Sequence, residues 1–193
     1  IMVSIDLGLY FHYQKNERGT KCNELKVIGK TDKTGTFVHF KPDGEIFEDL
    51  VYDYSILHKR LQEQAFLNAG VKIVLRDERP NEKGVLKEDV LHYEGGIREF
   101  VKHLNRHKTA IHEEVIYVNS IRENSEAEIA MQYNDGYTED IQSFANNIHT
   151  AEGGTHETGF KSAITKVLND YARKYKFLKE NDKNLSGEDT REG

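Results

Sequence analysis

A glycine-rich segment before a long helical pattern is the first feature of this sequence that suggests chemistry. Glu152-Gly-Gly-Thr-His156 leads directly into that pattern. Free backbone amides at a helix start, together with the helix dipole, can hold a phosphate group. The segment lacks the Gly-Lys-Ser/Thr ending of a P-loop. The simpler interpretation, a glycine turn in which Thr155 caps the helix, is therefore favoured.

The long helical pattern itself carries a row of basic residues. Its apolar positions share one face. The basic residues fall on the remaining arc and are Lys161, Lys166, Arg173, Lys176 and Lys179. Such an arc can hold a nucleic-acid backbone without reading its base sequence. A solvated helix face explains the same pattern and is favoured by composition alone.

Histidine and serine positions do not form a metal site or a catalytic site by their spacing. His103 and His107 stand four residues apart on a helical pattern, close to the spacing of metal ligands, but no third ligand accompanies them. The serines lack the Gly-x-Ser-x-Gly pattern of a nucleophile elbow. We therefore predict no metal site and no self-contained catalytic residues.

The composition is that of a polar, globular protein. The 193 residues are 31% charged and 37% hydrophobic, which suffices for one large domain or two small ones. No apolar run approaches the roughly 20 residues that cross a bilayer, and no signal-peptide pattern opens the chain. Together with the single cysteine, Cys22, this favours the cytoplasm and no membrane partner. The net charge of -6 means that any nucleic-acid contact needs a local basic face.

Hydrophobic periodicity predicts the elements that position these residues. Alternation over residues 3–13 predicts one strand. Further strands are expected at residues 25–28, 36–41, 71–75, 115–118, 127–133 and 137–146. Helices are expected after Asp53, over residues 97–104 and from Thr155 onward.

Turn and capping signals divide these elements. Gly70 should end the first helix, and a loop near a domain boundary is expected over residues 77–89. Asn134-Asp135-Gly136 predicts a hairpin between the last two strands. Residues 186–189 resemble a capping box, which predicts a further helix start. Phe160, Ile164 and Leu168 should pack against the strands around Ile129 and Phe144 as the core of the later half.

Six short strings occur in an order and spacing that point to one family. They are T-D-K-T-G-T from Thr31, A-F-L-N-A-G from Ala65, Y-E-G-G-I from Tyr93, Q-Y-N-D-G-Y from Gln132, E-G-G-T-H from Glu152 and G-E-D-T-R-E-G from Gly187. Each string is weak by itself. Together they resemble the B subunits of bacterial type II DNA topoisomerases, of the gyrase B kind, with the topoisomerase IV B protein as the near alternative. The resemblance covers nearly the whole chain, although the first 18 residues match only as a generic strand.

The resemblance implies an α+β fold in two parts. Residues 1–93 are expected to be the C-terminal part of a GHKL-type ATPase domain, an α/β sandwich. Residues 94–193 are expected to be a transducer domain that resembles ribosomal protein S5 domain 2 and is truncated at its C-terminal end. Because the chain opens almost inside a strand and stops at a helix start, we expect it to be cut at both ends.

The family also implies ATP and Mg²⁺ as cofactors of the full-length parent. Gly35, Thr36 and Val38 are expected beside the nucleotide, with Thr36 matching the family threonine near the adenine. The glycine-rich lid, the Q-T-K loop and the acidic cleavage signatures of the family have no counterpart in this sequence. We therefore expect this chain alone to be catalytically incomplete and to bind neither cofactor tightly.

The implied parent reaction is ATP-dependent passage of one DNA duplex through another. The implied partners are DNA, a gyrase A-type protein and a second copy of the gyrase B-type protein. Lys161 occupies a position where the family places a basic residue facing the clamp cavity, and Lys166, Arg173 and Lys176 are further candidates for DNA contact. Two other functions stay open at this point, a stand-alone S5-like nucleic-acid-binding module and a purely structural dimerisation domain.

Overall fold

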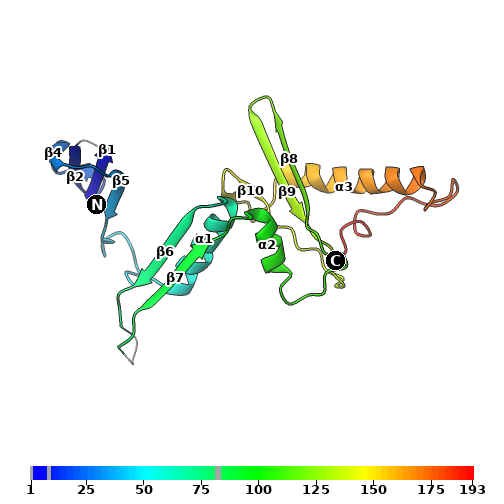
Figure 1. Ribbon diagram of the computed structural model, residues 1–193, viewed down its shortest axis with the longest axis horizontal. Coiled ribbons are helices and arrows are strands. Elements are labelled where there is room, and N and C mark those ends of the chain that lie inside the picture. Colours follow the sequence, from blue (N-terminus) through cyan, green and yellow to red (C-terminus); the bar gives the residue numbers. More distant parts are fainter. Residues whose placement is uncertain (1, 8–9, 81–83) are drawn as a thin grey trace. The chain divides into compact units, whose positions relative to one another are not determined.

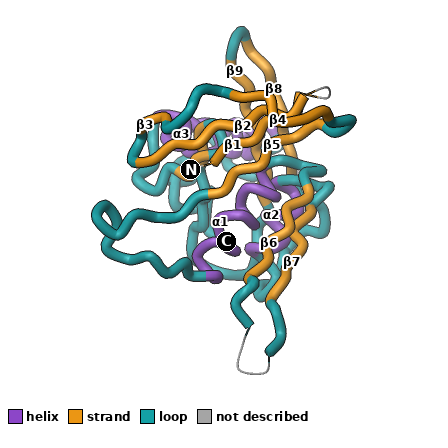
Figure 2. Tube along the Cα trace, turned by 90° about the vertical axis from the view of Figure 1, so that its left-hand side faces the viewer, coloured by secondary structure: helices purple, strands orange, loops and turns teal. Residues whose placement is uncertain are grey.

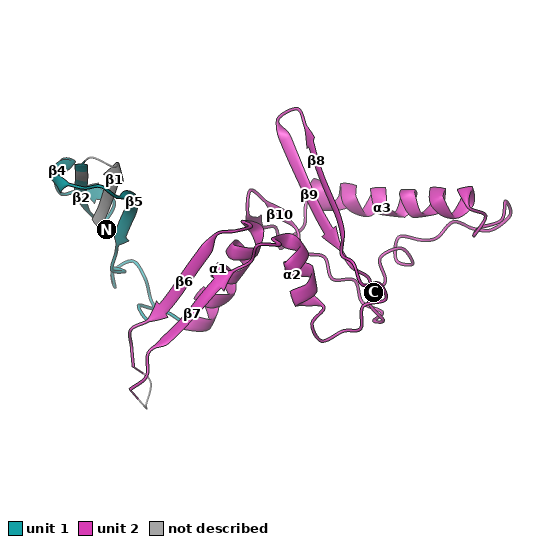
Figure 3. Cartoon of the chain, in the orientation of Figure 1, with its two compact units in different colours: residues 1–53 teal, residues 54–193 magenta. Residues whose placement is uncertain are grey.

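The computed structural model describes residues 2–7, 10–80 and 84–193. The chain divides into two compact units, residues 1–53 and residues 54–193 (Figure 3). Helices and strands both contribute, so the fold is α+β, as expected. The division into compact units falls inside the part assigned to the ATPase domain, and the functional boundary at 93/94 stays a prediction.

The first unit is an antiparallel sheet of five strands. They are β1 (Met2–Leu7), β2 (Tyr10–Glu17), β3 (Thr20–Lys21), β4 (Lys26–Lys30) and β5 (Thr34–His39). The strand order is β3-β2-β1-β5, and β4 also pairs with β2. Figure 1 shows these strands in blue.

The single strand predicted over residues 3–13 is wrong. The chain forms two antiparallel strands instead, in which Ser4 lies opposite Tyr13 and Val3 lies opposite Gln14. Gly8 and Leu9, in the middle of the predicted strand, lie outside the described residues. Alternation has the same period in both arms of a hairpin, so the pattern alone does not reveal where the chain reverses.

The second unit opens with a helix on a two-stranded hairpin, followed by a shorter helix. They are α1 (Tyr54–Leu67), β6 (Lys72–Asp77), β7 (Lys87–His92) and α2 (Ile97–Leu104). Helix α1 begins directly after Asp53, and Gly70 has a φ of 81° beyond its end, as the sequence indicated. Strand β6, predicted over residues 71–75, alternates exposed and half-buried residues. The predicted loop over residues 77–89 is shorter because β7 starts at Lys87, and residues 81–83 lie outside the described residues.

A stack of rings holds α1, α2 and the end of β7 together. Phe66 on α1 is 1% exposed. Its ring centroid lies 3.7 Å from that of Tyr93 and 4.9 Å from that of Phe100 on α2. Gly96 adopts a φ of 58° at the start of α2, where an added Cβ would stand 3.2 Å from the Ala69 Cβ. Helix α1 contacts α2 as well as β6 and β7, and Figure 2 shows the two helices side by side.

The rest of the second unit consists of two hairpins and the long helix. These elements are β8 (Ile116–Arg122), β9 (Ser125–Met131), β10 (Phe144–Ala145), β11 (Ile148–His149) and α3 (Thr155–Lys174). Strand β8 pairs with β9 and β10 pairs with β11, both antiparallel. Helix α3 starts at Thr155, as predicted.

The hairpin predicted at Asn134-Asp135-Gly136 is wrong, and so is the long strand predicted after it. The Gly136 amide donates to Asn134 Oδ1 at 2.9 Å, and Thr109 donates to Asp135 Oδ1 at 3.2 Å. Both the amide nitrogen and Nδ2 of Asn134 donate to the Gly193 carbonyl at 3.0 Å. These residues are therefore engaged by distant segments instead of reversing a strand, which local turn chemistry does not encode.

Helix α3 does not fully bury the apolar residues that were expected to form its core. Phe160 and Ile164 line an open cavity of about 850 Å³ together with Ile129 and Phe144, but none of the four is fully buried. The buried residues of α3 are Asn169 and Ala172. The Asn169 side chain accepts from the Leu185 amide at 2.8 Å and donates to the Leu185 carbonyl at 3.0 Å.

The capping box predicted at residues 186–189 forms. The Ser186 amide donates to Asp189 Oδ2 at 2.7 Å, and the Asp189 amide donates to Ser186 Oγ at 3.2 Å. A turn follows, in which the Glu192 amide donates to the Glu188 carbonyl at 3.0 Å. This bond spans four residues, as in a helix.

We expect Phe66→Ala to cost roughly 3–5 kcal/mol in the free energy of unfolding, because it removes a fully buried ring from a closely packed stack. Ile164→Ala is the matched control and should cost less than about 2 kcal/mol, since Ile164 is only half-buried. Urea unfolding of both variants measures the two values. Equal losses would show that the ring stack is not the main apolar core of this unit.

Candidate nucleic-acid interface

The N-terminus of α3 is covered by a side chain of the helix itself. Gly153 has a φ of 74°, and Gly154 occupies the N-cap position without a side-chain hydrogen bond. Thr155 is therefore the first helical residue and not the cap that the sequence suggested. An added Cβ on Gly154 would stand 2.7 Å from Cε1 of His156, so the histidine ring covers the glycine. This arrangement agrees with the turn interpretation of the glycine-rich segment.

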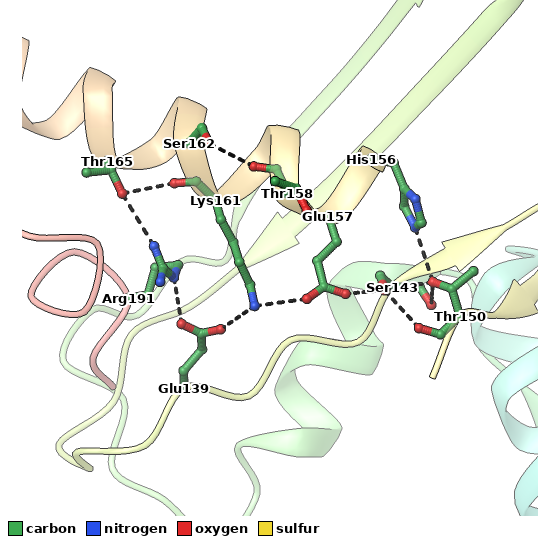
Figure 4. A network of polar contacts seen from close by, with 10 residues as sticks. All are labelled: Glu139, Ser143, Thr150, His156, Glu157, Thr158, Lys161, Ser162, Thr165 and Arg191. Carbon is green, nitrogen blue, oxygen red and sulfur yellow. Dashed lines mark hydrogen bonds and ion pairs between the residues drawn. The ribbon is translucent and has the colours of Figure 1, made fainter. Parts of the chain in front are cut away.

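Lys161 lies between two carboxylates, one turn into α3. Its Nζ is 2.8 Å from Glu139 Oε1 and 2.9 Å from Glu157 Oε1, and its side chain is 31% exposed (Figure 4). Glu157 precedes Lys161 by four residues, the favourable orientation for a helical ion pair. Glu139 comes from the loop before β10. The ammonium group therefore joins that loop to the helix.

Arg191 completes a balanced set of four charges. Its Nε donates to Glu139 Oε2 at 2.6 Å, so two cations face two carboxylates. Thr165 Oγ1 on α3 lies 2.9 Å from the hydroxyl of Thr190, which is 2% exposed. The Thr190 carbonyl accepts from the Tyr133 hydroxyl at 2.7 Å. The network thereby connects α3 to residues 186–193 and to the segment after β9.

Two hydroxyl groups extend the network toward the β10–β11 hairpin. Ser143 Oγ donates to Glu157 Oε2 at 2.6 Å and lies 2.8 Å from Thr150 Oγ1. Thr150 Oγ1 is in turn 3.1 Å from His156 Nε2. Figure 4 shows these residues as one continuous series of contacts between the hairpin and the first turn of α3.

The contacts shift the pKa values of the charged groups in consistent directions. The hydrogen bond from Lys161 is the main cause that lowers the pKa of Glu139. For Glu157 the hydrogen bond from Ser143 comes first and that from Lys161 second, and the pKa is again lowered. The two carboxylates raise the pKa of Lys161. All three groups are therefore held in their charged forms at neutral pH.

The five basic residues of the predicted arc do not gather on one surface. Lys161 and Lys166 are five residues apart, a rotation of about 140° around the helix. Arg173 binds the following segment, with Nη2 2.6 Å from Asn184 Oδ1 and 2.9 Å from the Asp182 carbonyl. Lys176 and Lys179 lie beyond the end of α3.

The exposed cations of the arc differ from Lys161 in their contacts. Lys166 and Lys176 are exposed, and their side chains contact no charged partner among the described residues. Their ammonium groups are exposed to solvent, whereas Lys161 and Arg173 bind other groups of the protein. Sequence reasoning identified the lysines but missed Glu139, which neutralises part of the Lys161 charge, and Arg191, which shares this carboxylate with Lys161. Of these contacts, only the Glu157–Lys161 spacing carries a signal in the sequence.

The residues expected beside the nucleotide lie on β5, an edge strand of the first unit. Gly35 pairs with Asp6 and Thr36 pairs with Ile5 on β1. Among the described residues, and leaving aside its two neighbours in the chain, no heavy atom lies within 4 Å of a Cβ added to Gly35, and Val38 is 53% exposed. That these residues lie beside a nucleotide stays a prediction. Nowhere in residues 2–7, 10–80 and 84–193 do three potential metal ligands converge.

His103, which the sequence spacing paired with His107, has a packing role. Its ring centroid lies 5.4 Å from that of Phe66, and burial lowers its pKa. A neutral ring suits this place in the aromatic stack.

Comparison with known proteins relates the chain to one family. The family model DNA gyrase B matches residues 96–193. The DNA gyrase B protein of Clostridium acetobutylicum is 58% identical over 181 residues, which is 93% of this chain and 28% of that protein. The DNA gyrase B protein of Staphylococcus aureus is 51% identical over 198 residues, covering 99% of this chain and 30% of that protein. The chain thus spans less than a third of these two relatives.

Solved structures show the same relationship. The 43K ATPase domain of Thermus thermophilus gyrase B, crystallised with an aminocoumarin, matches with a TM-score of 0.82 and 36% identity, covering 100% of this chain and 52% of that one. The gyrase B protein of Myxococcus xanthus matches with a TM-score of 0.74 over 89% of this chain and 50% of that one. At 22% identity, the second match supports the fold alone. Among the described residues, no helix combines the length and apolar character that crossing a bilayer requires.

The four-charge network predicts a loss of stability in acid that depends on Glu139. The pKa values of Glu139 and Glu157 are lowered from their ordinary value of 4.5. Their contribution is fully present above pH 4.5 and is lost as the pH falls through their lower folded values. In Glu139→Gln, which has one fewer such group, the decrease of the melting temperature below pH 4.5 should be shallower than in wild type.

The control for this measurement is Glu48→Gln, because the Glu48 carboxylate is exposed and has no partner among the described residues. Its melting temperature should follow the wild-type pH dependence. An unchanged acid dependence in Glu139→Gln would show that the network adds no pH-dependent stability.

Proposed function

The chain belongs to the DNA gyrase B family, and we propose that it is part of the ATP-operated clamp of a type II DNA topoisomerase. In this role it couples ATP binding and hydrolysis to DNA strand passage. The observation that carries the proposal is the identity of 51–58% to DNA gyrase B proteins over 93–99% of this chain. A stand-alone S5-like nucleic-acid-binding module is not favoured, because the match to the Thermus ATPase domain covers 100% of the chain.

Cofactors and partners follow from this proposal. The full-length protein uses ATP and Mg²⁺, and the strip formed by Gly35, Thr36 and Val38 lies against the adenine end of the nucleotide. DNA, a gyrase A-type protein and a second copy of the gyrase B-type protein are its partners in the cytoplasm. The open space beside Gly35 and the exposure of Val38 support the placement of the base.

The DNA-facing residues are proposed to be of two kinds. Lys166 and Lys176 are exposed and can bind phosphates directly, as long-range attraction to a polyanion requires. Lys161 must exchange Glu139 and Glu157 for phosphate oxygens, and Arg173 must leave its bonds to residues 179–184. DNA binding through Lys161 is thus a competition between phosphate and carboxylate for one ammonium group.

The proposed function is tested with a full-length gyrase B-type protein that contains this sequence, assembled with its gyrase A-type partner and incubated with plasmid DNA. We expect a change in DNA linking number that requires ATP. Gel electrophoresis of the plasmid topoisomers measures it. Binding to DNA without any ATP-dependent topological change would overturn the proposal and favour the S5-like binding module.

Competition for Lys161 predicts that removing a carboxylate strengthens DNA binding. Glu139→Gln leaves Lys161 with one anionic partner instead of two, so the 193-residue chain should bind duplex DNA more tightly. Glu48→Gln changes the net charge by the same amount without releasing a paired cation, so its effect should be smaller. Fluorescence anisotropy with a labelled duplex compares the two variants.

The gain must also depend on Lys161. In a Lys161→Ala background, Glu139→Gln should bind DNA no more tightly than Glu48→Gln does in that background. A gain that persists without Lys161 would assign the effect to Arg191, the other cation that Glu139 binds, and remove Lys161 from the proposed DNA contacts.

A further inference from the structure

The tip of the β10–β11 hairpin is hydrogen-bonded to α1. The Asn147 carbonyl accepts from Gln64 Nε2 at 2.9 Å and from Arg60 Nη2 at 3.4 Å. The Asn147 side chain donates through Nδ2 to Asn68 Oδ1 at 2.9 Å, just past the end of α1. Segments about 80 residues apart in the sequence therefore meet at a single residue.

Asn147 lies in the two-residue turn between β10 and β11. Asn146 and Asn147 have φ values of 49° and 63°, as in the two-residue turns that connect tightly paired strands. Ala145 pairs with Ile148 on either side of the turn. Asparagine tolerates this left-handed backbone better than most residues, and here it also supplies an amide.

The other end of the same hairpin is bound to α3. The Thr150 amide donates to the Ser143 carbonyl at 2.8 Å and closes the base of the hairpin. Ser143 Oγ then donates to Glu157 Oε2, and Glu157 Oε1 lies 2.9 Å from Lys161 Nζ. A continuous path of contacts thus runs from α1 through Asn147 and the hairpin to the ammonium of Lys161.

We propose that the β10–β11 hairpin is a coupling element, in which Asn147 is a positioning residue that links the placement of α1 to the availability of Lys161 for DNA. This inference rests on the proposed function. Helix α1 follows directly on residues 1–53, which carry Gly35, Thr36 and Val38. The two states are Lys161 held by the carboxylates and Lys161 released to phosphate.

The contacts of Asn147 with α1 can break and re-form while α1 stays packed on α2. The bonds of Asn147 to α1 are exposed, so water replaces them at little net cost. By contrast, Phe66 is buried in its ring stack and holds α1 on α2 in either state. A shift of the hairpin would withdraw Ser143 from Glu157 and move Phe144, whose ring centroid lies 6.2 Å from that of Phe100, while Phe66 stays packed between Tyr93 and Phe100.

The test uses the full-length gyrase B-type protein with its gyrase A-type partner and measures ATP turnover with and without duplex DNA. Asn147→Gly removes the amide and keeps the positive φ. We expect the ratio of DNA-stimulated to basal turnover to fall about two- to ten-fold, with basal turnover unchanged. Asn146→Gly is the matched control, because its side chain has no partner among the described residues, and it should leave the ratio as in wild type.

A double-mutant cycle separates coupling from simple structural damage. If Asn147 acts through Lys161, adding Asn147→Gly to Lys161→Ala should cause no further loss of DNA stimulation. Gln64→Ala, which removes the other strong bond to the hairpin tip, should reproduce the effect and keeps the test valid if Asn147→Gly folds poorly.

Distinct outcomes overturn the two proposals. Equal ratios for Asn147→Gly, Gln64→Ala and Asn146→Gly, or losses that add fully to that of Lys161→Ala, would overturn the coupling element while leaving the topoisomerase function intact. Absence of ATP-dependent topological change in the wild-type assembly would overturn the function and the coupling with it.

Discussion

The ammonium group of Lys161, placed between the carboxylates of Glu139 and Glu157, is the contact on which the arrangement around α3 depends. It fixes a loop that has little regular structure of its own against the first turn of the helix. Arg191 adds the second cation, so the four charges balance. Balance matters because Glu157 and Arg191 are each 18% exposed, and a partly desolvated charge without a partner is costly.

In the second unit, the stability of the fold and the placement of its polar side chains come from different interactions. The stack around Phe66 supplies apolar burial, which is the larger contribution to folding. The ion pairs are partly exposed, and such pairs contribute little net stability. Their effect is geometric, since charged hydrogen bonds have narrow distance and angle preferences. The polar network therefore determines where side chains lie, on a scaffold that the aromatic core keeps folded.

The elements set by local signals were predictable from the sequence, and those set by distant contacts were not. Helix α2 begins at Ile97 and α3 at Thr155, where glycine pairs precede apolar residues at helical spacing. Asn134-Asp135-Gly136 carries an equally strong turn signal, yet its groups bond to Thr109 and to residue 193. A local turn signal predicts the conformation of a segment in isolation. Contacts with distant segments determine whether the folded protein adopts that conformation.

The same distinction applies to the candidate DNA contacts. Periodicity placed the lysines of α3 away from its apolar positions, but it carried no information on which charges the protein neutralises. Lys161 and Lys166 looked equivalent in the sequence, and the structure makes one an internal ion-pair partner and the other a free surface charge. Glu139, whose position nothing in the sequence predicted, makes this difference. In a chain with a net charge of -6, the proposed attraction of DNA would depend less on the number of lysines than on which carboxylates hold them.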